Sequence, residues 1–343
     1  MPDAASLPSQ ARHAGRPAAP RWQRELAEAI RDPEELCRLL GLPAAFAAEA
    51  RGAAGDFPLL VPRGFAARMQ RGDPHDPLLA QVLPRGAERL ELAGFSADPL
   101  AEAAAVAGPG LVRKYAGRAL LLVTGACAVN CRYCFRREFP YAERGATRAG
   151  VEAALDAIAA DTGIEEVILS GGDPLLLDDD RLADIVRRLE RMPHVRRLRI
   201  HSRLPIVLPS RVTDDFAGLL ASSRLTIVIV VHANHPAELD ESVTVAVRRL
   251  AAVPAIVLNQ AVLLAGVNDS VDVLRALSER LVEIGVVPYY LHLLDRVRGA
   301  GHFEVDEPRA VGLHRDLLAC LPGYAVPRLV REQPGAQSKT WVT

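Results

Sequence analysis

The sequence predicts an α/β fold in the form of a partial (βα)6 barrel of the TIM type, preceded by a helical N-terminal extension. From about residue 118 onward, short runs rich in Val, Ile and Leu recur, each about as long as a buried strand. Helix-like segments separate these runs, and the chain between successive runs is long enough for a right-handed crossover. Six alternating units predict a parallel sheet that is covered by helices and stays open.

The segment that precedes the barrel is expected to be mostly helical. Residues 1–20 are rich in Ala, Pro, Arg and Ser and lack the apolar stretch of a secretory signal, so we expect a disordered tail. Residues 21–110 are expected to form the helical N-terminal region, in which apolar side chains recur at helical spacing. Asp32-Pro33 provides the start signal of a second helix there.

The barrel itself is expected to span residues 111–300, and residues 301–343 are expected to form a C-terminal helix and a tail. Between the predicted strands, apolar stripes such as Leu182, Ile185 and Leu189 predict helices that face the sheet. The predicted strands are 119–124, 166–170, 197–201, 225–231, 255–260 and 287–292.

Composition excludes several classes of protein. The chain has 343 residues, half of them apolar, which suits one large or two modest domains. Its formal net charge is −1, so we expect no nucleic-acid partner, and no apolar run has the length of a membrane span. The five cysteines, an odd number with three of them clustered, do not form a disulfide framework and favour a cytoplasmic location.

The clustered cysteines, Cys127, Cys131 and Cys134, have the spacing C-x3-C-x2-C. Thiolates are the usual ligands of a [4Fe–4S] cluster, which normally takes four of them. Three thiolates leave one iron open, an arrangement that suits reductive cleavage of S-adenosylmethionine (SAM), which is one route to radical chemistry. The alternatives are three unrelated thiols or a Cys3His zinc site, for which no histidine lies nearby in the sequence.

Polar residues follow each predicted strand at its C-terminal end, where barrel enzymes build their active sites. Six such clusters in register predict one active site at one mouth of the barrel. In chain order they are the cysteine loop, Ser170-Gly171-Gly172-Asp173, His201-Ser202-Arg203, His232-Ala233-Asn234-His235, Asn259-Gln260, and His292 with Asp295.

Lysine is rare in this chain. Of 41 basic side chains only Lys114 and Lys339 are lysines, and the others are arginines. Any chemistry that needs a lysine amine therefore has two candidates, because an arginine guanidinium stays protonated and forms no useful imine.

With these residues assembled, the chain resembles the radical-SAM lysine 2,3-aminomutases, and most of all the bacterial branch that makes β-lysine for the modification of elongation factor P. The resemblance runs from about Trp22 to Thr340. The end of the chain soon after Lys339 favours this branch over the catabolic aminomutases, which continue further. The motifs that carry the resemblance are GACAVNCRYCFRR (125–137), FPYAE (139–143), SGGDPL (170–175), RIHSRLPIVLPSR (199–211), NQAVLLAGVND (259–269), PYYLHLLDRV (288–297) and SKT (338–340).

The resemblance implies three cofactors: a [4Fe–4S] cluster on the three cysteines, SAM, and pyridoxal 5′-phosphate (PLP) held by Lys339 as a Schiff base. A lysine so near the C terminus is otherwise read as a solvated tail residue, and the Gly-Gly turn as an ordinary strand-to-helix turn. The residues implied for SAM are Gly171, Gly172, Asp173, Ser202, Arg203 and His232. The residues implied for PLP, besides Lys339, are Lys114, Tyr115, Arg118 and Gln260.

The resemblance also implies how the substrate is bound. Arg136 would bind the α-carboxylate with its guanidinium fork, and Asp295 and Glu332 would bind the ε-ammonium of lysine. Glu332 stands where lysine mutases usually have an aspartate, and both carboxylates are otherwise read as surface residues. The implied reaction moves the amino group of free L-α-lysine from Cα to Cβ by means of a 5′-deoxyadenosyl radical, which makes the chain an isomerase.

The implied partners are lysine, an electron donor that reduces the cluster, and, as a functional link, elongation factor P with its β-lysine ligase. Three alternatives stay open: an aminomutase that acts on glutamate or arginine, a radical-SAM enzyme that modifies RNA, and a non-catalytic iron–sulfur protein. The balanced charge and the lysine implied for PLP disfavour RNA, and neither a nucleic acid nor a membrane is expected as a partner.

Overall fold

The computed structural model describes residues 19–55 and 57–343, so the tail expected over residues 1–20 lies almost entirely outside the described residues. The fold is organised around a ten-stranded sheet in which each strand pairs with the next one along the chain, from β1 to β10. Strands β3 to β9 run parallel, whereas β1, β2 and β10 join the two ends of the sheet in antiparallel pairs. The predicted α/β fold with a mainly parallel sheet is confirmed.

The six predicted barrel strands are confirmed almost to the residue. Their buried side chains are mainly Val, Ile, Leu and Ala with almost no exposed surface, as the continuous apolar runs predicted. They are β3 (Arg118–Thr124), β4 (Glu166–Gly171), β5 (Arg197–Ser202), β6 (Thr226–Val231), β7 (Ala255–Val262) and β8 (Val287–His292).

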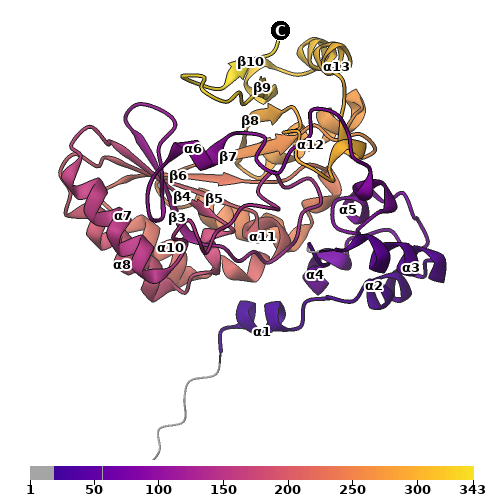
Figure 1. Cartoon of the computed structure of the whole chain (residues 1–343), viewed down its shortest axis with the longest axis horizontal. Coiled ribbons are helices and arrows are strands. Elements are labelled where there is room, and N and C mark those ends of the chain that lie inside the picture. Colours follow the sequence, from indigo (N-terminus) through magenta and orange to yellow (C-terminus); the bar gives the residue numbers. More distant parts are fainter. Residues whose placement is uncertain (1–18, 56) are drawn as a thin grey trace, which may run out of the picture.

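Helices connect the parallel strands. Each begins at a Thr, Asp or Ser whose side chain accepts a hydrogen bond from a backbone N–H of the first turn. Figure 1 shows α7, α8, α10 and α11 along one side of the sheet. These connecting helices are α7 (Arg148–Ala160), α8 (Asp179–Glu190), α10 (Asp214–Ala221), α11 (Glu241–Ala251) and α12 (Val271–Glu283).

The chain after β8 differs from the expected helix and tail. It contains the helix α13 (Glu307–Cys320) but also β9 (Arg328–Arg331) and β10 (Thr340–Trp341), which form an antiparallel hairpin on the edge of β8. The two short strands β1 (Val106–Gly108) and β2 (Leu111–Val112) at the other end were not predicted either. Runs of two to four residues have no periodicity to detect, so their pairing depends on the neighbouring strand.

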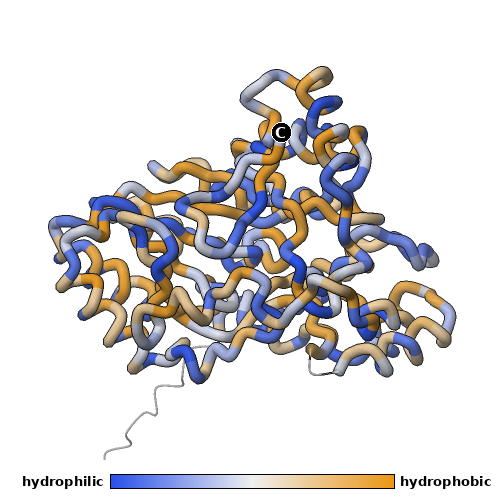
Figure 2. Tube along the Cα trace, turned by 45° about the horizontal axis from the view of Figure 1, so that its top comes forward, coloured by the Kyte–Doolittle hydropathy of each residue, from blue (hydrophilic) through white to orange (hydrophobic). Residues whose placement is uncertain are grey.

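The N-terminal region consists of short helices that share one hydrophobic core with the sheet. The predicted restart is present: Asp32 caps the second helix, and Pro33 is its first residue. Figure 1 shows α2 to α5 together at the end of the sheet opposite to α7 and α8, and Figure 2 shows apolar stretches in both parts. The helices are α1 (Arg21–Ala27), α2 (Pro33–Leu40), α3 (Ala44–Ala53), α4 (Arg63–Ala66), α5 (Pro77–Ala80) and α6 (Glu102–Ala105).

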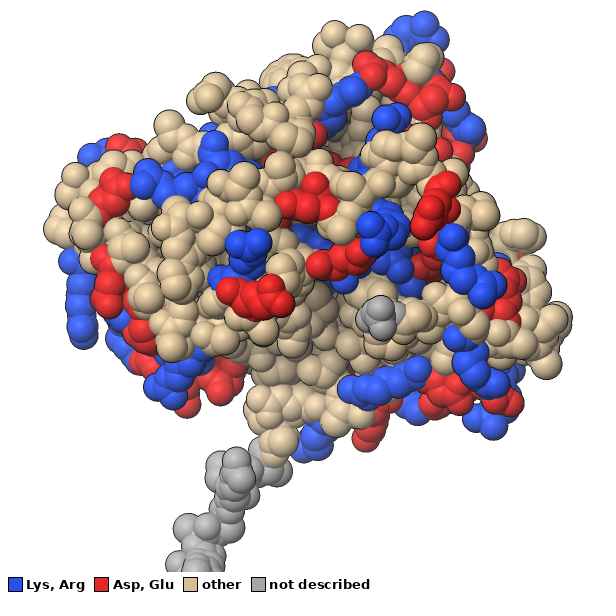
Figure 3. All heavy atoms as spheres, viewed as in Figure 1, with Lys and Arg blue, Asp and Glu red and all other residues tan. Residues whose placement is uncertain are grey.

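The surface carries both signs of charge. Figure 3 shows Lys and Arg interspersed with Asp and Glu over the face in view, without a field of a single sign. Within the described residues, none of the helices combines the length and apolar character that crossing a membrane requires.

Candidate active site

The three cysteines lie on the loop that follows β3, and the N-terminal region holds this loop in place. The backbone N–H of Asn130 donates to the carbonyl of Leu60 at 3.1 Å, and that of Arg132 donates to the carbonyl of Gln81 at 2.8 Å. The side-chain amide of Asn130 also donates to a backbone carbonyl of the same region, at 2.9 Å. The helical extension therefore shapes the predicted cluster loop, in addition to covering an end of the sheet.

The Gly-Gly turn after β4 packs directly on the cysteine loop. Gly171 has a φ of 125°, which L residues with a side chain rarely adopt. A Cβ on Gly172 would lie 2.0 Å from the carbonyl oxygen of Ala126, the residue before the first cysteine. The backbone N–H of Asp173 donates to that same oxygen at 2.8 Å. Both glycines are thus needed for backbone contact with the loop, and their contact with SAM stays a prediction.

Asp173, Ser202 and Arg203, all expected at the SAM site, are brought together. The hydroxyl of Ser202 donates to Oδ1 of Asp173 at 2.7 Å, and the backbone N–H of Arg203 donates to Oδ2 at 2.7 Å. Burial raises the pKa of Asp173 to about 6, although these hydrogen bonds oppose the shift.

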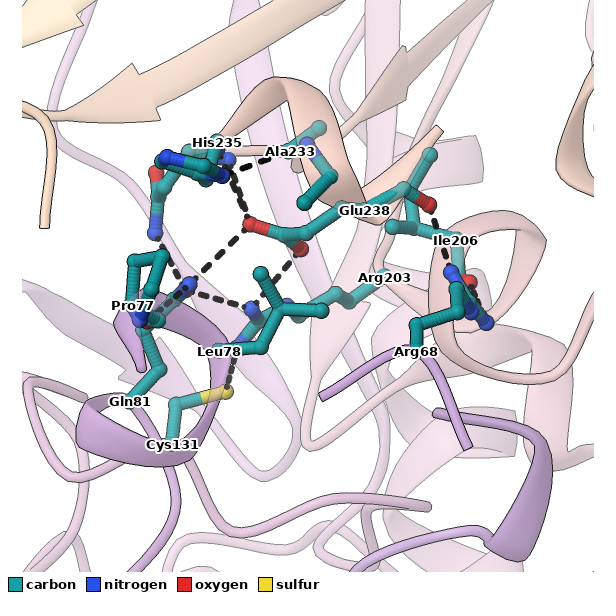
Figure 4. A network of polar contacts seen from close by, with 12 residues as sticks. Arg68, Pro77, Leu78, Gln81, Cys131, Arg203, Ile206, Ala233, His235 and Glu238 are labelled. Carbon is teal, nitrogen blue, oxygen red and sulfur yellow. Dashed lines mark hydrogen bonds and ion pairs between the residues drawn. The ribbon is translucent and has the colours of Figure 1, made fainter. Parts of the chain in front are cut away.

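The guanidinium of Arg203 connects the cysteine loop to the N-terminal helices (Figure 4). Nη1 donates to the sulfur of Cys131 at 2.7 Å, while Nη2 donates to Oε1 of Gln81 at 2.7 Å and to Oε2 of Glu238 at 3.1 Å. Glu238 also accepts the backbone N–H of Asn234 at 2.9 Å. The sequence analysis did not identify Gln81 or Glu238, because neither lies in a recognisable motif.

The three thiols fit a polynuclear cation. Burial, followed by the neighbouring thiol of Cys131, raises the pKa of Cys134 to about 11, and burial with both neighbouring thiols raises that of Cys127 well above its ordinary value. A bound cation reverses this penalty, because metal ligation deprotonates thiols. In the part of the chain that the structure describes, no three His, Cys, Asp or Glu side chains are arranged to hold one metal ion. An iron–sulfur cluster instead distributes its thiolates over several irons.

A cavity of about 350 Å³ collects most of the residues expected to bind PLP and the substrate. Of the residues expected at the SAM site, only His232 lines it, and the others lie on the side of the cysteine loop. The expected residues that line the cavity are Lys114, Tyr115, Arg118, Arg136, His232, Gln260, Asp295, Glu332 and Lys339.

Five charged side chains of alternating sign follow one another along the cavity. Arg136 binds Glu102 with two hydrogen bonds, from Nε at 2.6 Å and from Nη2 at 2.8 Å. Glu102 also lies 2.9 Å from the ammonium of Lys114. Lys114 contacts Glu332 at 2.7 Å, and Glu332 contacts Lys339 at 2.9 Å. This charge series joins the residue expected at the α-carboxylate to the residue expected to hold PLP.

The pKa values of Glu102 and Glu332, the two carboxylates of the charge series, are lowered, whereas that of Asp295, which also lines the cavity, is raised. Burial raises the pKa of Glu332, but the charges of Lys339 and Lys114 outweigh it and lower that pKa to about 2. Asp295 has no such compensation: burial and the charge of Glu332 raise its pKa to about 7. A bound cation beside Asp295 would restore its charge, which suits a site for an ammonium group.

The residues around Lys339 suit a planar anionic cofactor. Its Nζ lies 5.6 Å from the ring centroid of Tyr290, and Lys114 with Arg118 supplies positive charge for a phosphate. His292 is 3% exposed, and its Nε2 finds no hydrogen-bond partner among residues 19–55 and 57–343. An unpaired buried nitrogen in a cavity is expected to contact a ligand.

His292, expected among the polar residues at the strand ends, lines the cavity, whereas Tyr290 and Glu102 are cavity residues that the sequence analysis missed. Tyr290 lies in the PYYLHLLDRV motif, but no pattern singled it out as a contact. Glu102 lies in a segment of short helices and turns that has no clear periodicity, and only its position in space reveals it.

Comparison with known proteins gives consistent matches. The family model of the Radical SAM superfamily matches residues 121–243. An L-lysine 2,3-aminomutase of Escherichia coli is 49% identical over 325 residues, covering 94% of this chain and 95% of that protein. The enzyme of the same name from Haemophilus influenzae is 47% identical over 319 residues, covering 93% and 94%.

A more distant relative, the L-lysine 2,3-aminomutase of Clostridium subterminale, is 37% identical over 269 residues, which cover 78% of this chain and 64% of that protein. The matches to the Escherichia coli and Haemophilus influenzae enzymes each cover more than nine tenths of this chain. The chain therefore belongs to the L-lysine 2,3-aminomutase family, within the radical SAM superfamily.

Proposed function

We propose that this chain is an isomerase that converts free L-α-lysine into β-lysine, with a [4Fe–4S] cluster, SAM and PLP as cofactors. The observation that carries the proposal is the set of charged side chains that line the cavity. A guanidinium fork, Arg136, and a pair of carboxylates, Asp295 and Glu332, line the same cavity as Lys339. The bacterial relatives, which are named L-lysine 2,3-aminomutases, support the same substrate.

A free lysine molecule has a carboxylate at one end and an ammonium at the other, and the cavity offers a counter-charge for each. Arg136 would bind the α-carboxylate, because a guanidinium matches the two oxygens of a carboxylate. Asp295 and Glu332 would bind the ε-ammonium. Glutamate has no ammonium at that end, and its side-chain carboxylate would meet two carboxylates there.

The chain's own residues fit the cofactors. PLP, when bound, supplies a conjugated system that spreads an unpaired electron through the migrating nitrogen. Lys339 provides the amine that PLP requires, while Lys114 and Arg118 provide cations for its phosphate and Gln260 an amide beside them. Cys127, Cys131 and Cys134 would hold the cluster, which when reduced would supply an electron to SAM. Exclusion of water from the cavity during turnover would protect reactive intermediates.

Several finer parts of the proposal rest on the sequence and the resemblance. We assign β3 to β8 with their helices to a partial (βα)6 barrel, a cytoplasmic location to the chain, and a separate electron donor to the cluster. The residues that we assign to SAM binding are Gly171, Gly172, Asp173, Ser202, Arg203 and His232. The β-lysine product would be used in the modification of elongation factor P, through its β-lysine ligase.

The test is a reconstituted reaction. Protein purified without oxygen is given dithionite, SAM and PLP together with lysine, glutamate or arginine singly, and the β-amino products are identified by mass spectrometry. We expect β-lysine from lysine alone. Turnover of glutamate or arginine in place of lysine would contradict the substrate, and the absence of any SAM cleavage would indicate a non-catalytic iron–sulfur protein. Binding of zinc in place of iron would contradict the mechanism as a whole.

A further inference from the structure

Glu102 is a buried carboxylate that the proposed reaction does not otherwise use. Its side chain lines the cavity and is held by two cations, Arg136 and Lys114. Burial raises the pKa of Glu102, but the charges and hydrogen bonds of these two cations outweigh it, so that the pKa is lowered to about 2. The carboxylate is therefore ionised near neutral pH.

The backbone around Glu102 is built to direct this side chain inward. Ala101 has φ 49° and ψ 39°, and it is the one non-glycine residue with positive φ among residues 19–55 and 57–343. L residues with a side chain adopt this conformation at a cost, and such strain concentrates at functional sites. The carboxylate of Asp98 stabilises the turn by accepting the backbone N–H groups of Glu102 at 2.9 Å and Ala103 at 3.0 Å.

The hydrogen bonds of Arg136 show which of its guanidinium N–H groups have no partner among the described residues while Glu102 is bound. A guanidinium has five N–H groups. Glu102 accepts one from Nε and one from Nη2, and the hydroxyl of Ser170 accepts one from Nη1 at 2.9 Å. One N–H remains on each terminal nitrogen, Nη1 and Nη2. These two terminal nitrogens form the end of the fork, which can bind a second carboxylate without displacing the first.

We propose that Glu102 is a positioning residue, which holds the guanidinium of Arg136 by its side so that the end of the fork is presented to the α-carboxylate of the substrate. Lys114, bound to the same carboxylate, anchors Glu102 from the other side. The rings of Phe135 and Phe139 lie 4.9 and 5.9 Å from the guanidinium carbon and limit its rotation further. This role rests on the proposed function, because it requires a substrate with an α-carboxylate.

A second possible role of Glu102, competition with the substrate for Arg136, predicts the opposite change in the affinity for lysine. If Glu102 instead occupied the place of the substrate carboxylate, lysine would have to displace it, and removing its charge would tighten the binding of lysine. If Glu102 positions Arg136, removing its charge weakens the binding of lysine.

The experiment compares two ligands on the reconstituted protein with PLP, without reductant or SAM. Lysine and its decarboxylated analogue cadaverine are each titrated, and binding is followed by the change in the absorbance of the PLP Schiff base. In Glu102→Gln we expect the Kd of lysine to rise about tenfold to hundredfold, because a charge-assisted contact is lost. The Kd of cadaverine, which has no carboxylate for Arg136, should stay within about twofold.

Glu88 provides the matched control. It is also a buried glutamate with two hydrogen bonds from one arginine, Arg132, and an ion pair to Arg137 at 2.8 Å, but it does not line the cavity. Glu88→Gln should leave the ratio of the two Kd values unchanged, even where it lowers the melting temperature. Glu102→Asp, which keeps the charge, should recover part of the affinity for lysine.

A failure of the proposed role of Glu102 can be distinguished from a failure of the proposed function. An equal loss of affinity for lysine and cadaverine in Glu102→Gln would reduce Glu102 to a structural role, and tighter lysine binding would show competition. Either result overturns the inference while the wild type still makes β-lysine. A wild type that binds PLP but neither ligand would instead contradict the proposed function.

Discussion

Nζ of Lys339 lies 2.9 Å from Oε2 of Glu332, and the two residues face each other at the end of a hairpin. Thr340 of β10 pairs with Arg331 of β9, so Lys339 and Glu332 are the next cross-strand neighbours in the same register. The side chain of Lys339 is only 20% exposed in spite of its place near the C terminus. The hairpin thus holds Lys339 at a fixed place in the cavity, which distinguishes it from a solvated tail residue.

Replacement of Lys339 tests which amine holds PLP. Lys339→Ala should abolish the near-visible absorbance of the Schiff base and leave the iron–sulfur absorbance intact, because none of the three clustered cysteines lines the cavity that Lys339 lines. Lys114→Ala, which removes the one other lysine of the chain, is the control and should keep the Schiff-base band. Retention of the band in Lys339→Ala, with its loss in the control, would assign PLP to Lys114.

The raised pKa of Asp295 predicts a pH dependence for substrate binding. Only the ionised carboxylate attracts an ammonium group, so KM for lysine should fall as the pH rises through about 7. Asp295→Asn should flatten this profile and lower kcat/KM by about tenfold or more, or about 1.4 kcal/mol. The check is the set of steady-state profiles of the two proteins, and a profile of unchanged shape in the variant would exclude Asp295 as the titrating group.

The raised pKa of Asp295 also predicts how the free energy of unfolding changes with pH. Burial, followed by the charge of Glu332, lifts the pKa of Asp295 from its ordinary value, near about 4, to about 7. Between these values the folded protein binds more protons than the unfolded one, so the contribution of Asp295 to the free energy of unfolding decreases as the pH rises. Denaturant titrations of the protein without substrate should show this loss, and Asp295→Asn should reduce it.

Gly172→Ala tests the contact between the Gly-Gly turn and the cysteine loop. The new Cβ would lie 2.0 Å from the carbonyl oxygen of Ala126, so the loop must move, at a cost of about 1–3 kcal/mol in the free energy of unfolding. We expect the bound iron per chain to fall as well, because the displaced loop carries all three thiols. Gly218→Ala in α10 has no atom within 4 Å of the added methyl group, so it should leave the bound iron unchanged and raise the free energy of unfolding by up to about 1 kcal/mol, because alanine favours the helix.

The Arg203–Glu238 pair predicts a large, non-additive effect on stability. Glu238 is fully buried, and Arg203→Met would leave its charge without the opposing guanidinium, which costs about 3–5 kcal/mol. Glu238→Gln in the same background removes the uncompensated charge, so the double variant should be less destabilised than the sum of the two single variants. Urea denaturation of the three proteins measures this coupling, and strict additivity would show that the two side chains act independently.

The barrel strands were predictable because each is a local signal. In β6, every residue from Ile227 to Val231 is Ile or Val, which is typical of a strand that is covered on both faces. The placement of the polar residues after these runs then follows from the parallel sheet, since all its carboxyl ends lie at one edge. This reasoning brought together Gln260, His292 and Asp295, which line one cavity.

The missed residues act through contacts that no local pattern encodes. Glu238 and Gln81 are far apart in the sequence and meet only because the N-terminal helices pack on the sheet, where the Gln81 amide donates to the Glu238 carboxylate at 3.2 Å. Glu102 reaches Arg136 only through the left-handed conformation of Ala101, and alanine gives no sign of that conformation in a sequence. The contacts of these residues depend on tertiary packing, which local sequence propensity does not reveal.

The hairpin of β9 and β10 fixes the separation between Lys339 and Glu332. Because its two ends are in fixed register, the amine that would tether the cofactor and one of the carboxylates that would receive the far end of the substrate move together. Insertions at the tip of the hairpin, around Gly335, would leave that separation unchanged, whereas a shift of one residue in either strand would turn one of the two side chains away. If Glu332 receives the ε-ammonium as proposed, selection among amino acids of different length would depend on this strand pairing, and variation of the tip alone would not relax it.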